Sequence, residues 1–264
     1  MDKNLAYNSL NAINLFTDNI VNSFRKEELI LHVPHSSTHI PIEIGFVNDS
    51  IKLAELDLVT DWYTDEIFDL ENVTKIVTPF SRIFCDVEKF DDKDEELFKF
   101  GRGYFYTHNG NGEVLRENDL KLKEIIFKEF YLNHHNKLIN LVEEKLNKYS
   151  TAFIVDCHSF NDVPLNLDLN QNNNRPDICL GVNKYHTPLH ILIYVQKYFA
   201  DLGFSTSINS PYSNTMIPLK YLNKNNNVQG IMIEINKKIY LDSNNKPNLF
   251  KIKDLNKIIS ELFI

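Results

Sequence analysis

Short apolar runs alternate with longer amphipathic segments along the chain, and this alternation constrains the fold most strongly. The apolar runs, each five to eight residues long, lie at 29–33, 73–80, 152–156, 177–182 and 230–235. Segments with helical periodicity lie at 53–70, 118–149, 187–203 and 253–263. Strands that are apolar on both faces must be covered on both sides. The pattern therefore predicts an α/β fold with a central mixed, mainly parallel sheet flanked by helices.

The composition is that of a folded chain with an extensive core. Of the 264 residues, 43% are hydrophobic and 12% are aromatic, so the material for a core is ample. This length is compatible with one α/β domain, and the asparagine-rich patches at 170–174 and 223–227 are typical of surface loops. We therefore expect a single domain over residues 1–264.

Charge and cysteine content restrict the partners and the compartment. The formal net charge of -8 argues against nucleic acid and against an anionic membrane, because both repel a net anion. The three cysteines (Cys85, Cys157 and Cys179) are far apart and form no C-x-x-C pair, so neither a disulfide framework nor a thiolate zinc site is indicated. The N-terminal segment lacks the basic start and unbroken apolar run of a signal peptide. We expect a cytoplasmic protein with a small-molecule partner and leave its oligomeric state open.

Two histidines stand at the ends of apolar runs. His35 follows the run at 29–33, and His158 follows the run at 152–156. Either histidine alone is better explained as a hydrogen-bonded loop residue. In α/β sheets, however, ligands bind at the carboxyl ends of the strands, and neighbouring strands lie about 5 Å apart. The pair therefore predicts a metal site, with Zn²⁺ as the expected ion.

A catalytic zinc site commonly takes a carboxylate as its third protein ligand. Asp61 and Asp65 are both candidates, because their i, i+4 spacing places them on one face of a predicted helix. An ordinary acidic helix face is the alternative for each. Asp156 could instead accept a hydrogen bond from an imidazole N–H of a ligand.

Glu234 is a charged residue inside the apolar run at 230–235, where burial makes an unsatisfied carboxylate costly. It is a candidate general base, and an ion pair with a buried lysine or arginine is an equal alternative. Arg82 could grip a substrate carboxylate with Asp86 beside it, although an ion pair between the two is the simpler interpretation.

Further candidates lie outside the strand ends. Arg102 belongs to a loop at 100–116 that could form the rim of a pocket or an exposed hairpin. We expect Arg102 and Tyr212 to contact substrate. Adjacent residues of a helix point about 100° apart, so only one of His134 and His135 can face a shared site, and we select His135 for a supporting role.

Other catalytic classes lack their motifs. The G-x-S-x-G elbow of serine hydrolases is absent, as are the glycine-rich nucleotide-binding patterns. A nucleophilic Cys157 beside His158 is disfavoured, because neighbouring residues on a strand point to opposite faces.

The sequence resembles the N-formylglutamate amidohydrolase family over roughly residues 29–242. The resemblance rests on an ordered set of segments: PHSSTHIP, DWYTDEIF, SRIFCDVEKF, GRGYFYT, GEVLR, YLNHHNKL, VDCHSF, RPDICLG, PYSNT and IMIEINKKIYLD. One segment departs from the family pattern. Glu88-Lys89 stands where the family usually has Asn-Arg, and lysine does not replace arginine in bidentate carboxylate recognition.

The resemblance implies a zinc-carboxypeptidase-like (phosphorylase/hydrolase-like) fold with one zinc ion. By this resemblance, His35, Asp61 and His158 would hold the zinc ion. Glu234 would be the general base or acid, and Arg82 would bind the substrate carboxylate. Carboxypeptidases place a glutamate three residues after the first histidine, and this chain has Thr38 there.

The implied reaction is zinc-dependent hydrolysis of N-formylglutamate to glutamate and formate, a late step of histidine degradation. The expected substrate class is thus a small anionic N-formyl or N-acyl amino acid. Two alternatives remain: a zinc amidase or peptidase acting on small peptides or cell-wall fragments, and a non-catalytic metal-binding relative.

Overall fold

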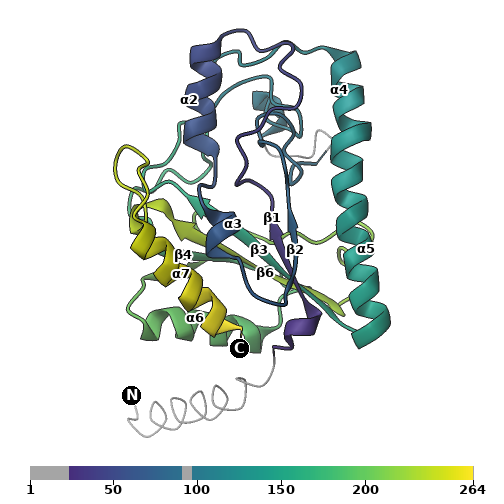
Figure 1. Cartoon of the computed structure of the whole chain (residues 1–264), viewed down its shortest axis with the longest axis vertical. Helices are drawn as coiled ribbons and strands as arrows, with labels where there is room; N and C mark the ends of the chain where they lie inside the picture. The colour runs from purple at the N-terminus through teal and green to yellow at the C-terminus, as the bar shows by residue number, and fades with distance from the viewer. Residues whose placement is uncertain (1–23, 91–96, 264) are drawn as a thin grey trace, which may run out of the picture.

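The computed structural model describes residues 24–90 and 97–263, and a six-stranded sheet runs through this part of the chain (Figure 1). The strand order is β2-β1-β3-β6-β4-β5. All neighbouring strands are parallel except β4 and β6, which pair antiparallel. The expected mixed, mainly parallel sheet is confirmed. The strands are β1 (Leu29–Val33), β2 (Thr74–Val77), β3 (Ala152–Phe160), β4 (Ile178–Gly181), β5 (Thr206–Ile208) and β6 (Val228–Asn236).

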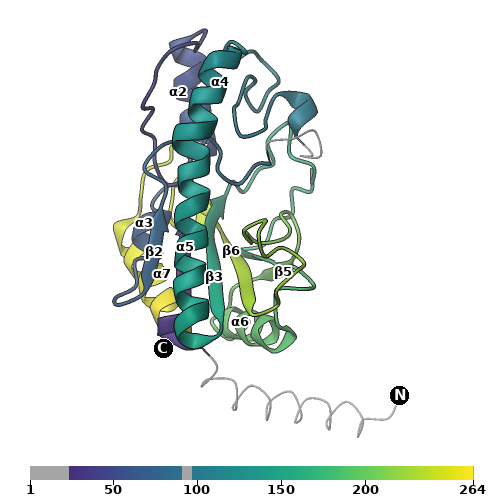
Figure 2. The same cartoon turned by 90° about the vertical axis from the view of Figure 1, so that its right-hand side faces the viewer.

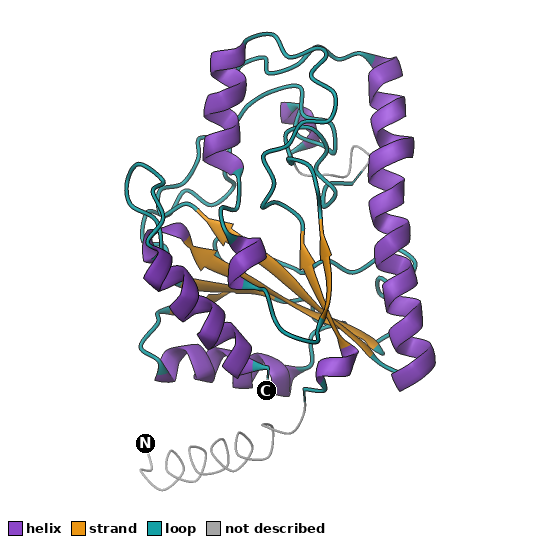
Figure 3. Ribbon diagram, viewed as in Figure 1, coloured by secondary structure: helices purple, strands orange, loops and turns teal. Residues whose placement is uncertain are grey.

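Helices flank the sheet on both faces (Figure 3). None of the described helices is long and apolar enough to cross a membrane. The N-terminal segment that argues against a signal peptide lies outside the described residues. The α-helices are α2 (Asp49–Val59), α3 (Thr64–Ile67), α4 (Leu120–Ile126), α5 (Leu132–Tyr149), α6 (Leu189–Asp201) and α7 (Leu249–Leu262). Short 3₁₀ turns occupy η1 (Lys26–Glu28), η2 (Phe98–Phe100) and η4 (Lys237–Ile239).

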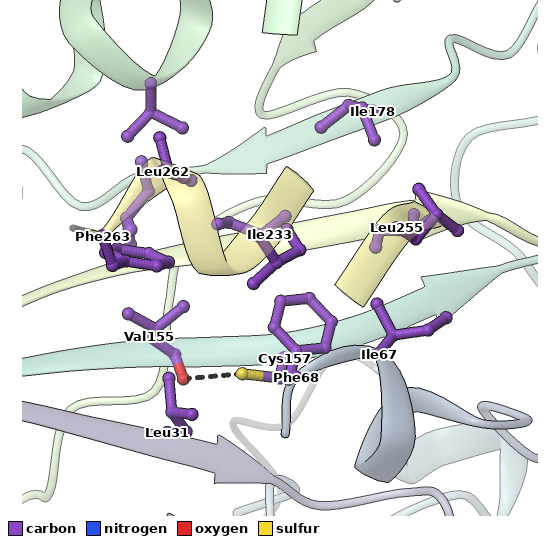
Figure 4. Packing of buried hydrophobic residues seen from close by; sticks show 14 of the residues in the cluster. Leu31, Ile67, Phe68, Val155, Cys157, Ile178, Ile233, Leu255, Leu262 and Phe263 are labelled. Carbon is purple, nitrogen blue, oxygen red and sulfur yellow. Dashed lines mark hydrogen bonds between the residues drawn. The ribbon is translucent and has the colours of Figure 1, made fainter. Parts of the chain in front are cut away.

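The alternation of side chains along the strands builds a separate core on each face. Leu31, Val155 and Ile233 point to the face covered by α3, α6 and α7, where they join a large apolar cluster (Figure 4). Ile30 and Ile154 point to the opposite face, where α5 covers them. Full burial of each such side chain stabilises the fold by roughly 1.5–3 kcal/mol. His32 and Asp156 share the second face and therefore lie under α5.

Cys157 belongs to the first of these cores. It is buried among apolar side chains, and its thiol donates to the Val155 carbonyl at 3.1 Å (Figure 4). Burial raises the pKa of the Cys157 thiol well above its usual value, which suppresses the thiolate. The strand alternation thus separates Cys157 from His158, as the sequence analysis expects.

The prediction of one helix over 53–70 is wrong, because the structure has two separate helices in this segment. Helix α2 ends at Val59 because Thr60 is extended and its hydroxyl donates to the Leu56 carbonyl. Tyr63 then adopts the left-handed conformation before α3 begins. Asp61 therefore lies in a turn between two helices and does not share a helix face with Asp65.

The predicted helix at 118–149 is interrupted by a π-helical turn, η3 (Phe127–Tyr131), which joins α4 to α5. The three segments form one continuous rod beside the sheet (Figure 2). A π-turn rotates the side chains that follow it relative to a regular α-helix, and such turns are frequent at functional sites. Beyond the sheet, α2 and α4 enclose a third apolar cluster that includes Phe84, Tyr106 and Leu122 (Figure 1).

Candidate metal centre and active site

The topology brings four acidic and imidazole side chains together at the carboxyl ends of β1, β3 and β6. His35 follows the end of β1 by two residues, and His158 and Glu234 are register partners in the paired strands β3 and β6. The backbone N–H of Asp61 donates to the His35 carbonyl at 3.0 Å, which docks the turn after α2 beside β1. All four residues are buried.

The Asp61 carboxylate lies between the two imidazoles. Its Oδ2 is 3.0 Å from His158 Nδ1 and 3.7 Å from His35 Nδ1. Burial alone would raise the pKa of Asp61, but its interactions with both histidines outweigh burial and lower the pKa. Asp65, the other carboxylate considered from the sequence, is exposed on α3. The geometry therefore favours Asp61 over Asp65.

An aspartate faces the other nitrogen of each imidazole. His35 Nε2 donates to Asp86 Oδ1 at 2.9 Å, and His158 Nε2 lies 3.2 Å from Asp156 Oδ1. A neutral imidazole with a proton on Nε2 keeps its lone pair on Nδ1. Asp86 and Asp156 are therefore placed as carboxylates commonly are when they orient metal-binding histidines, and Nδ1 of each ring is directed at the Asp61 carboxylate.

Glu88 is a further carboxylate in this cluster. Its Oε1 lies 3.1 Å from His158 Nε2, and its Oε2 lies 3.6 Å from His35 Nδ1. Ligand atoms of His35, Glu88 and His158 all lie within 4.8 Å of one another, and so do those of His32, Glu88 and Asp156. Carboxylate and imidazole are both accepted zinc ligands, so Glu88 is a second candidate for the third ligand.

Two observations test whether these residues fit a cation. His35 Nδ1 is fully buried and has no hydrogen-bond partner among the described residues. In addition, Glu88 and Asp156 raise the pKa of His158 well above its usual value, although burial alone would lower it. The cluster therefore stabilises positive charge and contains a vacant nitrogen donor. The residues present fit a divalent cation.

The Asp86 carboxylate accepts hydrogen bonds from three side chains and from the backbone N–H of Glu88, the latter at 3.2 Å. Besides His35, Arg82 donates to Asp86 Oδ2 through Nε at 3.2 Å and Nη2 at 3.0 Å. The Tyr106 hydroxyl donates to the same oxygen at 2.6 Å. The two Arg82 bonds make an ion pair with Asp86, the simpler of the two interpretations offered from the sequence. This network fixes the aspartate that orients His35.

A buried chain of hydrogen bonds lies behind His158. His32 Nδ1 donates to Asp156 Oδ1 at 2.8 Å, and His32 Nε2 lies 2.9 Å from His134 Nε2. The Thr78 hydroxyl lies 3.3 Å from His134 Nδ1. His134 is thus the histidine of α5 that faces the cluster. His135, selected from the sequence, instead donates from Nε2 to the Val87 carbonyl at 2.8 Å, so it supports the backbone of the Glu88 loop.

Glu234 lines a cavity of about 500 Å³ together with Asp61, His158 and Glu88. Its Oε2 is buried without a hydrogen-bond partner among the described residues, and no ion pair with a described lysine or arginine satisfies it. Burial raises the pKa of the Glu234 carboxyl to about 8. A carboxyl group with a pKa near neutrality can both accept and return a proton, which is the requirement for a general base.

The predicted substrate-binding residues Arg82, Arg102 and Tyr212 also line this cavity. Arg102 pairs through Nη1 with Glu55 Oε1 at 3.1 Å and stacks over the Tyr106 ring at 4.6 Å. The Tyr212 hydroxyl donates to Asp168 Oδ2 at 3.2 Å. Cavities of this volume, with several convergent polar groups, are typical small-molecule sites.

The sequence matches the profile of N-formylglutamate amidohydrolase over residues 27–241, which includes every residue of the cluster. The chain belongs to this family. No curated protein matches the sequence.

Solved structures of the family fold agree with this assignment. The chain resembles an N-formylglutamate amidohydrolase from Ralstonia eutropha JMP134 with a TM-score of 0.76 and 16% identity, covering 89% of this chain and 91% of that one. It also resembles a gene product from Agrobacterium tumefaciens with a TM-score of 0.63 and 14% identity, covering 90% and 91% of the two chains. At these identities the likeness extends to the fold alone.

Sequence reasoning missed three members of the cluster. Glu88 differs from the usual family residue, and this difference alone does not place its carboxylate beside the two histidines. The sequence pattern indicates no role at the site for His32 or for His134. Within the N-formylglutamate amidohydrolase fold, the pairing of β1 with β3 places His32 opposite Asp156, and no local sequence pattern reveals that contact.

Proposed function

We propose that this protein is a zinc-dependent hydrolase of small N-formyl or N-acyl amino acids, with N-formylglutamate as the first candidate substrate. The observation that carries the proposal is a pair of buried, unpartnered atoms in one cluster: His35 Nδ1 and Glu234 Oε2. The first is a vacant donor for a metal ion, and the second is a vacant acceptor for a proton.

His35 and His158 would hold the ion through Nδ1, with Asp61 as the third protein ligand. Asp86 and Asp156 would keep Nε2 of each imidazole protonated and its ring oriented. A bound Zn²⁺ would polarise the amide carbonyl and make a water molecule acidic enough to act as the nucleophile.

Glu234 would transfer the proton. Its raised pKa of about 8 makes the ionised carboxylate a stronger base than an ordinary glutamate, and Oε2 would accept the proton of the attacking water in that form. The same oxygen would then give this proton to the leaving amine nitrogen as the C–N bond breaks. The burial of Glu234 on β6 keeps bulk water from competing for that proton.

The cations around the cavity support an anionic substrate. Arg82 and Arg102 both line it, and their positive charge would favour the carboxylates of an acylated amino acid. For N-formylglutamate, the products would be glutamate and formate, which would place the reaction late in histidine degradation. We also propose that the chain is one domain over residues 1–264 and acts in the cytoplasm.

The deciding experiment is a panel of N-formyl and N-acetyl amino acids, with short peptides and cell-wall fragments, assayed for amine release with and without added Zn²⁺. We expect zinc-dependent turnover to be fastest on N-formylglutamate. Zinc content is measured in the His35→Ala and His158→Ala proteins in parallel. Stoichiometric zinc at wild-type affinity in both variants would overturn the metal assignment. Turnover of peptides alone would show that the substrate is a peptide and not an acylated amino acid. Absence of any turnover would indicate a non-catalytic metal-binding relative.

A further inference from the structure

Lys237 is a buried cation on the same cavity as Glu234. It begins η4 directly after β6 and is only 5% exposed. Its side chain lines the cavity together with His158 and Glu234. Nζ donates one long hydrogen bond, of 3.4 Å, to the Leu58 carbonyl. Within residues 24–90 and 97–263, no carboxylate forms an ion pair with it.

The two arginines on this cavity differ from Lys237 in this respect. Arg82 is paired with Asp86, and Arg102 is paired with Glu55. Both guanidinium groups therefore use part of their donor capacity inside the protein. The Lys237 ammonium has three donors and, among the residues that the structure describes, a single neutral acceptor, so it keeps donors for a ligand.

A buried ammonium without a counterion is unfavourable, and such groups usually acquire a partner or lose their proton. Burial lowers the pKa of Lys237 to about 8, so the ammonium form still predominates at neutral pH. The neighbouring Lys238 has the ordinary arrangement: it is half-exposed and pairs with Asp162 at 2.9 Å. The contrast between adjacent lysines indicates that the missing partner of Lys237 is supplied from the cavity.

We propose that Lys237 binds a carboxylate of the substrate and thereby selects acylated amino acids over neutral amides. The identity of the substrate in this proposal rests on the proposed function. The presence of an anion-binding site at Lys237 does not. The position of Lys237, three residues beyond Glu234, would fix the carboxylate to the wall of the cavity beside the general base. Lys237 is thus a specificity-determining residue that contacts substrate.

The test uses glutarate, a dicarboxylate without an amide bond, so that binding is measured independently of turnover. Calorimetric titration of the zinc-loaded wild-type protein should show saturable glutarate binding. Lys237→Met and Lys237→Gln should each weaken it by about 10- to 100-fold, because a hydrogen bond to a charged group is lost. Lys238→Met is the matched control and should bind glutarate as the wild type does. Thermal unfolding checks that each variant is folded.

Kinetics separates this role from a purely structural one. With N-formylglutamate, Lys237→Met should raise KM far more than it lowers kcat, and Lys237→Arg should restore part of the affinity. The preference for N-formylglutamate over its neutral diamide, in which both carboxyl groups are amidated, should fall in Lys237→Met. Unchanged glutarate affinity in the two Lys237 variants, or no glutarate binding by the wild type, would overturn the proposal. Glutarate binding through Lys237 without hydrolysis of any substrate would retain this site and reject the proposed function.

Discussion

Glu88 Oε1 lies 3.1 Å from His158 Nε2, on the ring edge opposite the one that faces Asp61. His158 is therefore placed among three carboxylates, with Asp61 at Nδ1 and both Glu88 and Asp156 at Nε2. This arrangement lets Nδ1 bind a cation while Nε2 donates its proton, and it stabilises the imidazole in a single orientation. Glu88 acts either as this acceptor or as a ligand through Oε2, which approaches His35 Nδ1.

Removing the Glu88 charge should weaken metal binding. In Glu88→Gln, we expect the zinc dissociation constant to rise by about 10- to 100-fold, the range found for residues that support metal ligands. Competition with a chromophoric chelator measures this constant directly. Glu117→Gln is the matched control, because Glu117 is exposed and lies outside the cluster. Equal zinc affinity in Glu88→Gln and the wild type would show that Glu88 neither binds nor orients the metal.

The proton-transfer role of Glu234 predicts a separation between metal binding and catalysis. Glu234→Gln should keep stoichiometric zinc, while its kcat falls by about 100- to 10,000-fold, the usual contribution of a general base. Zinc content by atomic absorption and turnover of N-formylglutamate are measured on the same samples. A kcat close to the wild-type value would exclude Glu234 as the base.

The Arg82–Asp86 pair predicts coupled losses of stability. Arg82→Ala leaves Asp86 buried with one cationic partner fewer, so we expect unfolding to become easier by about 1–3 kcal/mol. Urea unfolding of Arg82→Ala, Asp86→Asn and the double variant gives the interaction energy. Additive effects would mean that the pair is not coupled.

An unchanged KM in Arg82→Ala would separately exclude the predicted substrate-carboxylate clamp.

His134 predicts a loss of stability in mild acid. Burial lowers its pKa to about 2, so below its unfolded pKa of about 6.5 the unfolded chain binds a proton that the folded chain does not. The free energy of unfolding should therefore fall as the pH falls from about 6.5, by up to about 1.4 kcal/mol per pH unit. His135, whose pKa burial lowers to about 4, adds a slope of the same sign. His35 and His158 have raised pKa values, so near and above pH of about 6.5 the folded chain keeps protons that the unfolded chain loses, and these two histidines contribute a slope of the opposite sign there.

The measurement is urea unfolding of the chelator-treated protein at several pH values between about 5 and 7. His134→Gln should lose the part of this pH dependence that His134 contributes, and the double variant His134→Gln/His135→Gln should lose most of it. His190→Gln, on the outer part of α6, serves as the control and should keep the wild-type slope. The same slope in His134→Gln and the wild type would contradict the assignment.

Much of the fold follows from local patterns. The apolar runs at 29–33 and 230–235 match β1 and β6 because a strand buried on both faces must be apolar at nearly every position. Glu234 is the one charged residue in the apolar run of β6. A charge at such a position indicates a functional site, because burying it is costly. The short strand β5 (Thr206–Ile208) went unpredicted, because three residues of mixed polarity carry no periodic signal.

By itself, the sequence determined the α/β architecture and the family. It also indicated the candidate site residues, because periodicity and strand-end position are properties of short segments; these candidates are His35, Asp61, His158 and Glu234. Only the tertiary structure favours Asp61 over Asp65, because α2 ends before Thr60 and α3 begins after the left-handed Tyr63, so the two aspartates do not share a helix face. It also decided the place of Glu88, because the loop that carries it is held by contacts from α5 that are distant in sequence. Side-chain partners across such distances depend on how the elements pack, and no local pattern records that packing.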